Sequence, residues 1–231
     1  IFGRPFLVWN INVFTMKLPF KKVSGFAFMF LLLLSAGCKK AESPVSGKEE
    51  NLPAVNARFT LLSPEQTGVE FINAFTENFD YNIYTYEYLY YGCGVAVGDV
   101  NGDGLPDLYF ASAFATNKLY LNRGNMTFAD VTDIAGVAAP DGYKTGVTMA
   151  DVNGDGLLDI YSCRTSKDDD GKKTDHLFIN KGNRTENGME IPVFEDQAKK
   201  LGLDDNSNTN HACFFDMDRD GDLDVFLLKL V

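Results

Sequence analysis

Three short acidic segments share a pattern of side chains that suits a hard metal ion. Each reads D-x-[ND]-x-D-G-x-x-D, with oxygen-bearing side chains at positions 1, 3, 5 and 9 and glycine at position 6. Ca²⁺ takes roughly six to eight oxygen ligands, which carboxylates, amide oxygens and backbone carbonyls supply. We therefore predict that each segment is a calcium-binding loop.

The predicted ligands are the side chains at positions 1, 3, 5 and 9 together with the backbone carbonyl at position 7. Glycine at position 6 permits the positive φ that a chain curling around an ion requires. In the third loop, position 3 is aspartate rather than asparagine and position 7 is a further aspartate, which adds negative charge. The predicted ligand residues are Asp99, Asn101, Asp103, Leu105 and Asp107, then Asp151, Asn153, Asp155, Leu157 and Asp159, then Asp216, Asp218, Asp220, Asp222 and Asp224.

Acidic, glycine-containing segments can also form Asx-type turns without an ion, or EF-hands. Asx-type turns use the same residue types, but carboxylates packed together without a cation repel one another. An EF-hand would carry glutamate at position 12. Position 12 is Phe110, Ser162 or Leu227 here, and the following residues favour strands. We therefore favour calcium-binding loops that are not EF-hands.

Each loop lies inside a longer repeat that reads as four short strands. Residues 94–109, 146–161 and 211–226 align without gaps, and the likeness of the first two copies continues beyond them. Four strands per roughly 50 residues is the spacing of a propeller blade. One strand is expected before each loop, and the others are expected at 108–111, 160–162 and 225–228, at 119–122 and 177–180, and near 128–131 and 194–195.

The second copy is longer than the first at two places, residues 167–173 and 184–188. Both stretches are polar and rich in turn-forming residues, so we expect both to be loops.

With these residues in view, the segment from about residue 92 to 231 resembles FG-GAP/VCBS repeats. Such repeats form the calcium-loop blades of integrin α-type propellers and occur in many bacterial surface proteins. The resemblance implies an all-β fold, a partial β-propeller of four-stranded blades whose calcium-binding loops join strands one and two. Residues 93–231 would make about two and a half blades, which suggests a truncated, N-terminal fragment of a longer protein.

The N-terminal region reads as an export signal. Residues 1–15 have no interpretable pattern and are expected to be upstream translation that is not native, with Met16 as the start. Residues 16–37 combine a basic region with a short apolar run, as in a secretory signal peptide. The run ends Leu-Ser-Ala-Gly before Cys38, which resembles a bacterial lipobox and implies acylation of that cysteine. An ordinary cleaved signal and an uncleaved membrane anchor are the alternatives.

The segments between the signal and the first repeat differ in composition. Residues 38–57 are rich in Lys, Glu, Ser and Pro, which predicts a flexible tether. Residues 58–92 read as an aromatic-rich β lead-in, with short strands expected at 59–62 and 71–75. The tyrosine cluster at 81–91 is expected to pack against a neighbouring blade, and a sugar- or protein-binding face is the alternative.

Charge and motifs exclude several function classes. A formal net charge of −11, with 32 acidic and 21 basic residues, argues against a nucleic-acid partner. No G-x-S-x-G, H-E-x-x-H or P-loop motif is present, and His176 and His211 are expected to be structural, so an enzyme is not predicted. The cysteines other than Cys38 are expected to be buried small apolar residues, with one disulfide among them as the minority view.

These patterns together predict a calcium-binding, lipid-anchored cell-envelope protein whose propeller binds a glycan or protein ligand. The expected location is the outer membrane or cell surface of a Gram-negative bacterium, with the N-terminal lipid in the membrane. The alternative is a calcium-stabilised propeller scaffold of an enzyme whose catalytic part lies in a C-terminal region outside this sequence. A third hypothesis is a purely structural, calcium-stabilised spacer.

Overall fold

The computed structural model describes residues 8–9, 59–140, 142–167 and 173–230. The predictions for the signal peptide at 16–37, for Cys38 and for the tether at 38–57 lie outside these described residues. Among the described residues no helix is long and apolar enough to cross a membrane.

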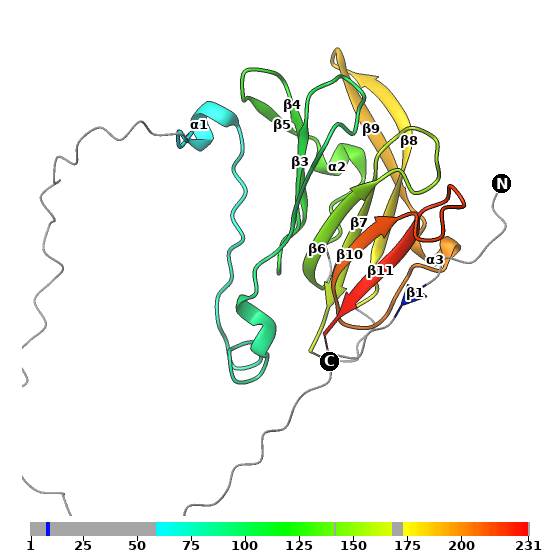
Figure 1. Cartoon of the computed structure of the whole chain (residues 1–231). Helices are drawn as coiled ribbons and strands as arrows, with labels where there is room; N and C mark the ends of the chain where they lie inside the picture. Colours follow the sequence, from blue (N-terminus) through cyan, green and yellow to red (C-terminus); the bar gives the residue numbers. More distant parts are fainter. Residues whose placement is uncertain (1–7, 10–58, 141, 168–172, 231) are drawn as a thin grey trace, which may run out of the picture. The chain divides into compact units, whose positions relative to one another are not determined.

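Two four-stranded antiparallel sheets follow one another along the chain, each with its strands in sequence order. Beside them a smaller sheet joins β10 (Thr209–Phe215) and β11 (Asp224–Lys229), and β1 (Val8–Trp9) pairs with β11 in parallel (Figure 1). The all-β class and the four-stranded repeat are confirmed, and the arrangement is consistent with part of a β-propeller. The first sheet comprises β2 (Val95–Gly98), β3 (Asp107–Phe110), β4 (Lys118–Asn122) and β5 (Phe128–Asp130), and the second comprises β6 (Tyr143–Ala150), β7 (Asp159–Thr165), β8 (His176–Glu186) and β9 (Met189–Asp196).

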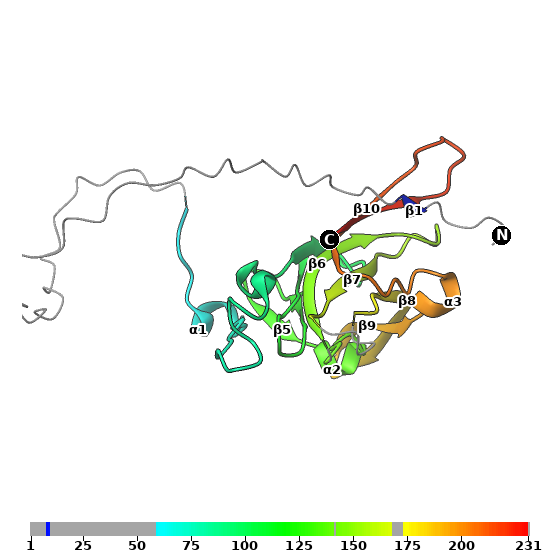
Figure 2. The ribbon, with the colours of Figure 1, turned by 90° about the horizontal axis from the view of Figure 1, so that it is seen from below.

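The first strands of the three copies adjoin one another, with β6 in contact with both β2 and β10. Glycines make this close approach possible. A Cβ on Gly94 would lie 2.6 Å from the backbone N of Val147, and one on Gly146 would lie 2.5 Å from the backbone O of Asn210. Figure 2 shows the second sheet, with β6 to β9 labelled, from below.

Apolar side chains between adjacent sheets form the core. One cluster fills the space between the first two sheets, and another joins the second sheet to β10 and β11. Tyr109, Leu119, Ile160 and Leu177 are fully buried in these clusters. Burying apolar surface contributes about 25 cal/mol per Å² to the free energy of folding. This hydrophobic contribution is the main one that holds the sheets together.

The second inserted stretch is not the loop that its polarity predicts. Strand β8 continues through Glu186, and β9 begins at Met189, so only Asn187 and Gly188 form the turn. Asn-Gly is the preferred pair for a two-residue hairpin turn, and here it lets the inserted residues pair as a longer hairpin. The first inserted stretch lies mostly outside the described residues.

The expected strands at 59–62 and 71–75 are wrong. Residues 59–92 contain only α1 (Pro64–Thr67) and the 3-10 helix η1 (Glu87–Tyr90), with no strand. Stacked rings attach this segment to the first copy instead. The Phe71 ring centroid lies 4.8 Å from that of Phe110 on β3, and the Phe75 centroid lies 4.6 Å from that of Phe114, between β3 and β4. Because ring packing anchors the segment, it needs no sheet hydrogen bonds.

Short helices follow the fourth strand in both four-stranded copies. α2 (Thr132–Ala135) follows β5, and α3 (Ala198–Leu201) follows β9. Each ends at a glycine in the left-handed region, Gly136 and Gly202. The likeness of the copies therefore extends past the fourth strand.

Candidate metal-binding loops

The three acidic loops occupy equivalent places in the repeat. Each joins the first strand of its copy to the second, with residues 99–107 between β2 and β3, 151–159 between β6 and β7, and 216–224 between β10 and β11. The ninth residue of each motif is the first residue of the second strand. The sequence correctly predicted this position between strands one and two.

Hydrogen bonds inside the first loop hold it in a tight curl. The Asp99 carboxylate accepts from the backbone N–H of Gly102 at 2.7 Å and of Gly104 at 2.8 Å. The Asp103 carboxylate accepts from the backbone N–H of Leu105 at 2.8 Å. Gly104 has φ +85°, which agrees with the need for glycine at position 6.

The second loop repeats these bonds. Asp151 accepts from the backbone N–H of Gly156 at 2.8 Å, and Asp155 accepts from that of Leu157 at 2.9 Å. Asn153 lies at the third position, where its side-chain oxygen accepts from the backbone N–H of Asp155 at 3.0 Å. Two copies with different flanking residues thus adopt one loop conformation.

The third loop gathers carboxylates most closely. One carboxylate oxygen each from Asp216, Asp218 and Asp224 lies within 4.8 Å of the other two. Asp216 accepts from the backbone N–H of Gly221 at 3.2 Å, as in the other loops. Asp216 and Asp218 are exposed and Asp224 is half-buried.

The aspartate at position 9 of the motif has a structural role that the sequence did not predict. Asp107 is fully buried, and its two carboxylate oxygens accept from the backbone N–H groups of Val100 at 3.0 Å and Asn122 at 2.8 Å. Asp159 makes the equivalent bonds to Val152 at 3.0 Å and Asn180 at 2.8 Å. This carboxylate therefore ties the start of the loop to the end of the third strand.

Burial raises the pKa of Asp107 and of Asp159 to about 6. The backbone hydrogen bonds oppose the rise, and the carboxylates at positions 1 and 5 add to it. A cation among these groups would favour their ionised forms instead.

Sequence reasoning missed the role of two asparagines on the third strands, Asn122 at the end of β4 and Asn180 within β8. Asn122 donates from its side chain to the Pro106 carbonyl at 2.9 Å, and Asn180 donates to the Val100 carbonyl at 2.8 Å. Asn183 donates to the Asn101 carbonyl at 2.6 Å, so strand β8 of the second sheet supports the first loop. The recurrence of Asn122 and Asn180 in the aligned copies was the signal that could have identified them.

The oxygen atoms present fit a hard divalent cation. Every loop offers carboxylate oxygens, and the first two also offer an asparagine oxygen. None contains a cysteine or histidine, so the donor set is that of Ca²⁺ rather than of Zn²⁺. An ionised carboxylate has about four acceptor sites. The loop carboxylates accept at most three internal hydrogen bonds, as Asp99 does, so each keeps acceptor capacity for an ion.

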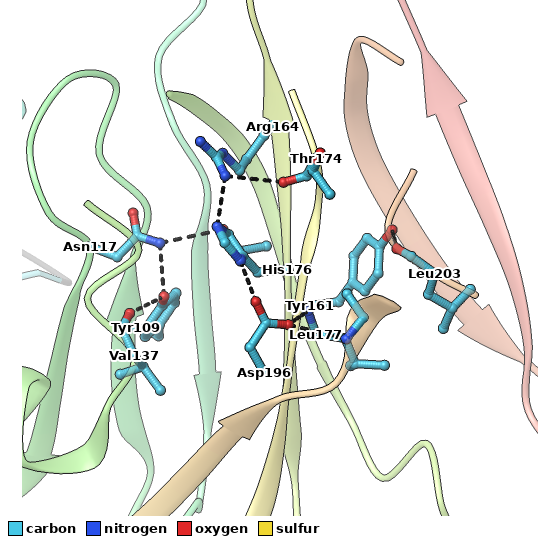
Figure 3. Close-up of polar contacts among 12 residues, drawn as sticks. Tyr109, Asn117, Val137, Tyr161, Arg164, Thr174, His176, Leu177, Asp196 and Leu203 are labelled. Carbon is cyan, nitrogen blue, oxygen red and sulfur yellow. Dashed lines mark hydrogen bonds and ion pairs between the residues drawn. The ribbon is translucent and has the colours of Figure 1, made fainter. Parts of the chain in front are cut away.

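A buried tyrosine network recurs in the two four-stranded copies (Figure 3). In the first, Tyr109 donates to the Val137 carbonyl at 2.8 Å and accepts from the Asn117 side chain at 2.8 Å. In the second, the Tyr161 hydroxyl lies within hydrogen-bond distance of the Asp175 carboxyl group at 2.9 Å and of the Leu203 carbonyl at 3.0 Å. Both tyrosines lie two residues after the aspartate at position 9 of the motif. The network therefore fixes the strand on which that aspartate lies.

His176 has both ring nitrogens engaged (Figure 3). Nδ1 lies 2.6 Å from the Asp196 carboxylate, and Nε2 lies 2.8 Å from the Arg164 guanidinium. Burial opposes ionisation of Asp196, but the hydrogen bonds from His176 and from backbone N–H groups outweigh it and lower the pKa of Asp196. The ring also stacks on Phe178 at 5.4 Å. The contacts with Arg164, Asp196 and Phe178 therefore hold the ring against strands of the second sheet.

The three cysteines in the described part of the chain are free thiols. Cys163 is buried, as expected, and Cys93 is half-buried. The expectation of burial is wrong for Cys213, which is exposed on β10. Alternate residues of a strand face opposite sides, and Ala212 takes the buried side here.

The comparisons with known proteins find a family match over part of the chain. Residues 94–162 match the FG-GAP-like repeat, and these residues include the first two acidic loops. Cartilage acidic protein 1 is 39% identical in mouse and in human over 69 residues, which are 30% of this chain and 11% and 10% of those proteins. The same protein of Xenopus tropicalis is 35% identical over 69 residues, again 30% of this chain and 11% of its own length. The match therefore spans about a tenth of the length of these relatives.

Proposed function

We propose that this chain is a calcium-binding, lipid-anchored cell-envelope protein whose repeat sheets bind a glycan or protein ligand. One observation carries the calcium proposal above the others. The same loop motif occurs three times between strands one and two, with its position 1 carboxylate bonded to the position 6 N–H each time. An FG-GAP-like repeat at residues 94–162 supports a binding or scaffold module.

The residues that would hold the ion are those at positions 1, 3, 5 and 9, together with the position 7 carbonyl. A bound Ca²⁺ would neutralise the gathered carboxylates and cross-link the loop to the second strand. The ninth aspartate would then join three parts: the loop, the second strand that it begins and the end of the third strand. The ion would thus stiffen each sheet at one end.

Calcium titration by calorimetry, with thermal melting in EDTA and in 10 mM Ca²⁺, tests this proposal. Asp103→Ala, Asp155→Ala and Asp220→Ala should each remove one binding site, because each deletes the position 5 carboxylate of one loop. Asp133→Ala, which removes an exposed acid outside the loops, is the matched control and should leave binding intact. A folded chain that binds no Ca²⁺ at 10 mM would overturn the metal assignment.

The anchoring proposal is tested in a Gram-negative host by metabolic labelling with a fatty acid. Label should enter the chain and be lost in Cys38→Ser, because that cysteine is the proposed acylation site. Cys213→Ser should keep the label. Label that persists in Cys38→Ser, or that never enters the chain, would contradict the anchor.

The ligand is sought with glycan arrays and with protein pull-downs in the presence of Ca²⁺ and of EDTA. A ligand that binds in Ca²⁺ and is released by EDTA is the expected result. Binding that persists equally in EDTA would separate ligand recognition from the calcium loops.

A further inference from the structure

A second site lies at the opposite end of the second sheet from its acidic loop. β6 and β7 are joined by the loop at Ala150 and Asp159, and they pair at their other ends through Tyr143 and Thr165. Beside this far end is a cavity of about 180 Å³, lined by Tyr81, Tyr86, Phe114, Gly142, Tyr143, Thr165, Ser166 and Lys167. Four separate segments of the chain converge there.

Ring contacts fix the aromatic wall of the cavity. The Tyr81 ring lies edge-on to Phe114 at 5.2 Å, and Phe114 lies edge-on to Tyr143 at 5.3 Å. Tyr86 is edge-on to Tyr143 at 5.6 Å, and its hydroxyl donates to Thr165 at 3.0 Å. These mutual contacts hold the wall in place before any ligand arrives, which lowers the entropic cost of binding.

The other wall is polar. Thr165 and Ser166 bring hydroxyl groups, and Lys167 is the one charged residue among the described residues that line the cavity. The Lys167 ammonium lies 4.5 Å from the centre of the Tyr81 ring and donates to the Asp80 carbonyl at 2.7 Å. An ammonium has three N–H donors, so donors remain for an anionic ligand.

Because one wall of the cavity is aromatic and the other is polar, we propose that the cavity binds the terminal residue of a carboxylate-bearing sugar, a uronic acid. Aromatic faces pack on the C–H groups of a sugar ring, and hydroxyls and an ammonium match its hydroxyls and its carboxylate. The cavity is smaller than the roughly 300–1,000 Å³ of drug-sized sites, which suits one sugar residue rather than an oligosaccharide. This inference rests on the proposed binding role and names its ligand class.

The test uses the full chain in 10 mM Ca²⁺ with glucuronate and, as the neutral match, glucose. Saturation-transfer NMR and calorimetry report binding. Glucuronate should bind at least about tenfold more tightly than glucose, because a charge-assisted hydrogen bond favours the carboxylate by that order. Lys167→Met keeps the apolar stem and should weaken glucuronate binding about tenfold while it leaves glucose unchanged.

Lys199→Met is the matched control, since Lys199 is an exposed lysine on α3 and does not line the cavity. It should leave glucuronate binding unchanged. Phe114→Leu tests the aromatic wall and should weaken both sugars, with a melting curve to check that the variant is folded. Equal affinity for the two sugars with no effect of Lys167→Met would overturn the carboxylate assignment, and no saturation transfer from either sugar would overturn the site. Calcium binding is measured in the same samples, so a failed sugar test is distinguishable from failure of the metal proposal.

Discussion

The ninth and fifth aspartates of one loop should have separable roles, and a pair of substitutions can separate them. Asp107 is fully buried with both carboxylate oxygens bonded to backbone N–H groups, whereas Asp103 is exposed. Asp107→Ala should therefore destabilise the chain even without metal. Asp103→Ala, which without metal loses only hydrogen bonds within the loop, should destabilise it mainly when Ca²⁺ is present.

The magnitudes follow from these contacts. An unsatisfied buried N–H costs about 1–3 kcal/mol, so losing both partners in Asp107→Ala should lower the free energy of unfolding in EDTA by about 2–6 kcal/mol. Asp107→Asn keeps one acceptor oxygen and should cost about half as much. For a site with Kd ~10⁻⁴ M, 10 mM Ca²⁺ adds about 2.7 kcal/mol, which Asp103→Ala should forfeit.

Urea unfolding followed by circular dichroism, in EDTA and in 10 mM Ca²⁺, measures both effects. Asp133→Ala controls for the loss of one negative charge. Equal stability of Asp107→Ala and Asp103→Ala in EDTA would refute the structural role of the ninth aspartate. If Asp103→Ala lowered the free energy of unfolding as much in EDTA as in Ca²⁺, the role of that carboxylate as a calcium ligand would be refuted.

Three further changes have defined outcomes. Burial raises the pKa of Asp175 to about 8, far above the ordinary value, so the folded state retains a proton that the unfolded chain releases. Stability should therefore fall as pH rises from about 4 to about 8 and then level off. Asp175→Asn should remove the share due to Asp175, at most about 6 kcal/mol, in urea titrations at several pH values, while the smaller share of Asp107 and Asp159 between about pH 4 and 6 remains. In a Cys38→Ser background, Cys213 should react with a thiol reagent first and Cys163 only on unfolding, so Cys213→Ser should abolish the fast phase. Gly146→Ala should lower the melting temperature by an amount equivalent to at least about 2 kcal/mol, because the new Cβ would meet a backbone oxygen at 2.5 Å; an unchanged melting temperature would contradict that close approach.

The first repeat copy already has an asparagine at the position where Asp175→Asn would place one in the second copy. Asn117 occupies the place of Asp175: it bonds to Tyr109 as Asp175 bonds to Tyr161, and it accepts from the Ser112 N–H at 3.0 Å as Asp175 accepts from the Arg164 N–H at 2.7 Å. This internal precedent indicates that Asp175→Asn will keep the fold. A variant that unfolds at pH 5 would show that Asp175 has a role that the amide cannot fill.

The sequence by itself determined the repeat, its four strands and the position of the acidic loops. Those features are local: alternation of apolar residues sets a strand, and glycine at position 6 sets the curl of the loop. The spacing of identical motifs then predicted how the copies correspond, and the structure places Gly104, Gly156 and Gly221 at φ +85°, +87° and +93° as that spacing requires.

Only the tertiary structure decided which groups lie next to one another. Composition could not tell that residues 59–92 would lack strands, because the stacking of Phe71 on Phe110 depends on a neighbouring sheet. Nor could it tell that Asp107 would be buried and bonded to Asn122, which lies fifteen residues away. Nor could composition predict the cavity beside Tyr143 and Lys167, because four segments that are distant in the sequence line it. Local patterns fix the elements, whereas burial and long-range contacts depend on how those elements pack.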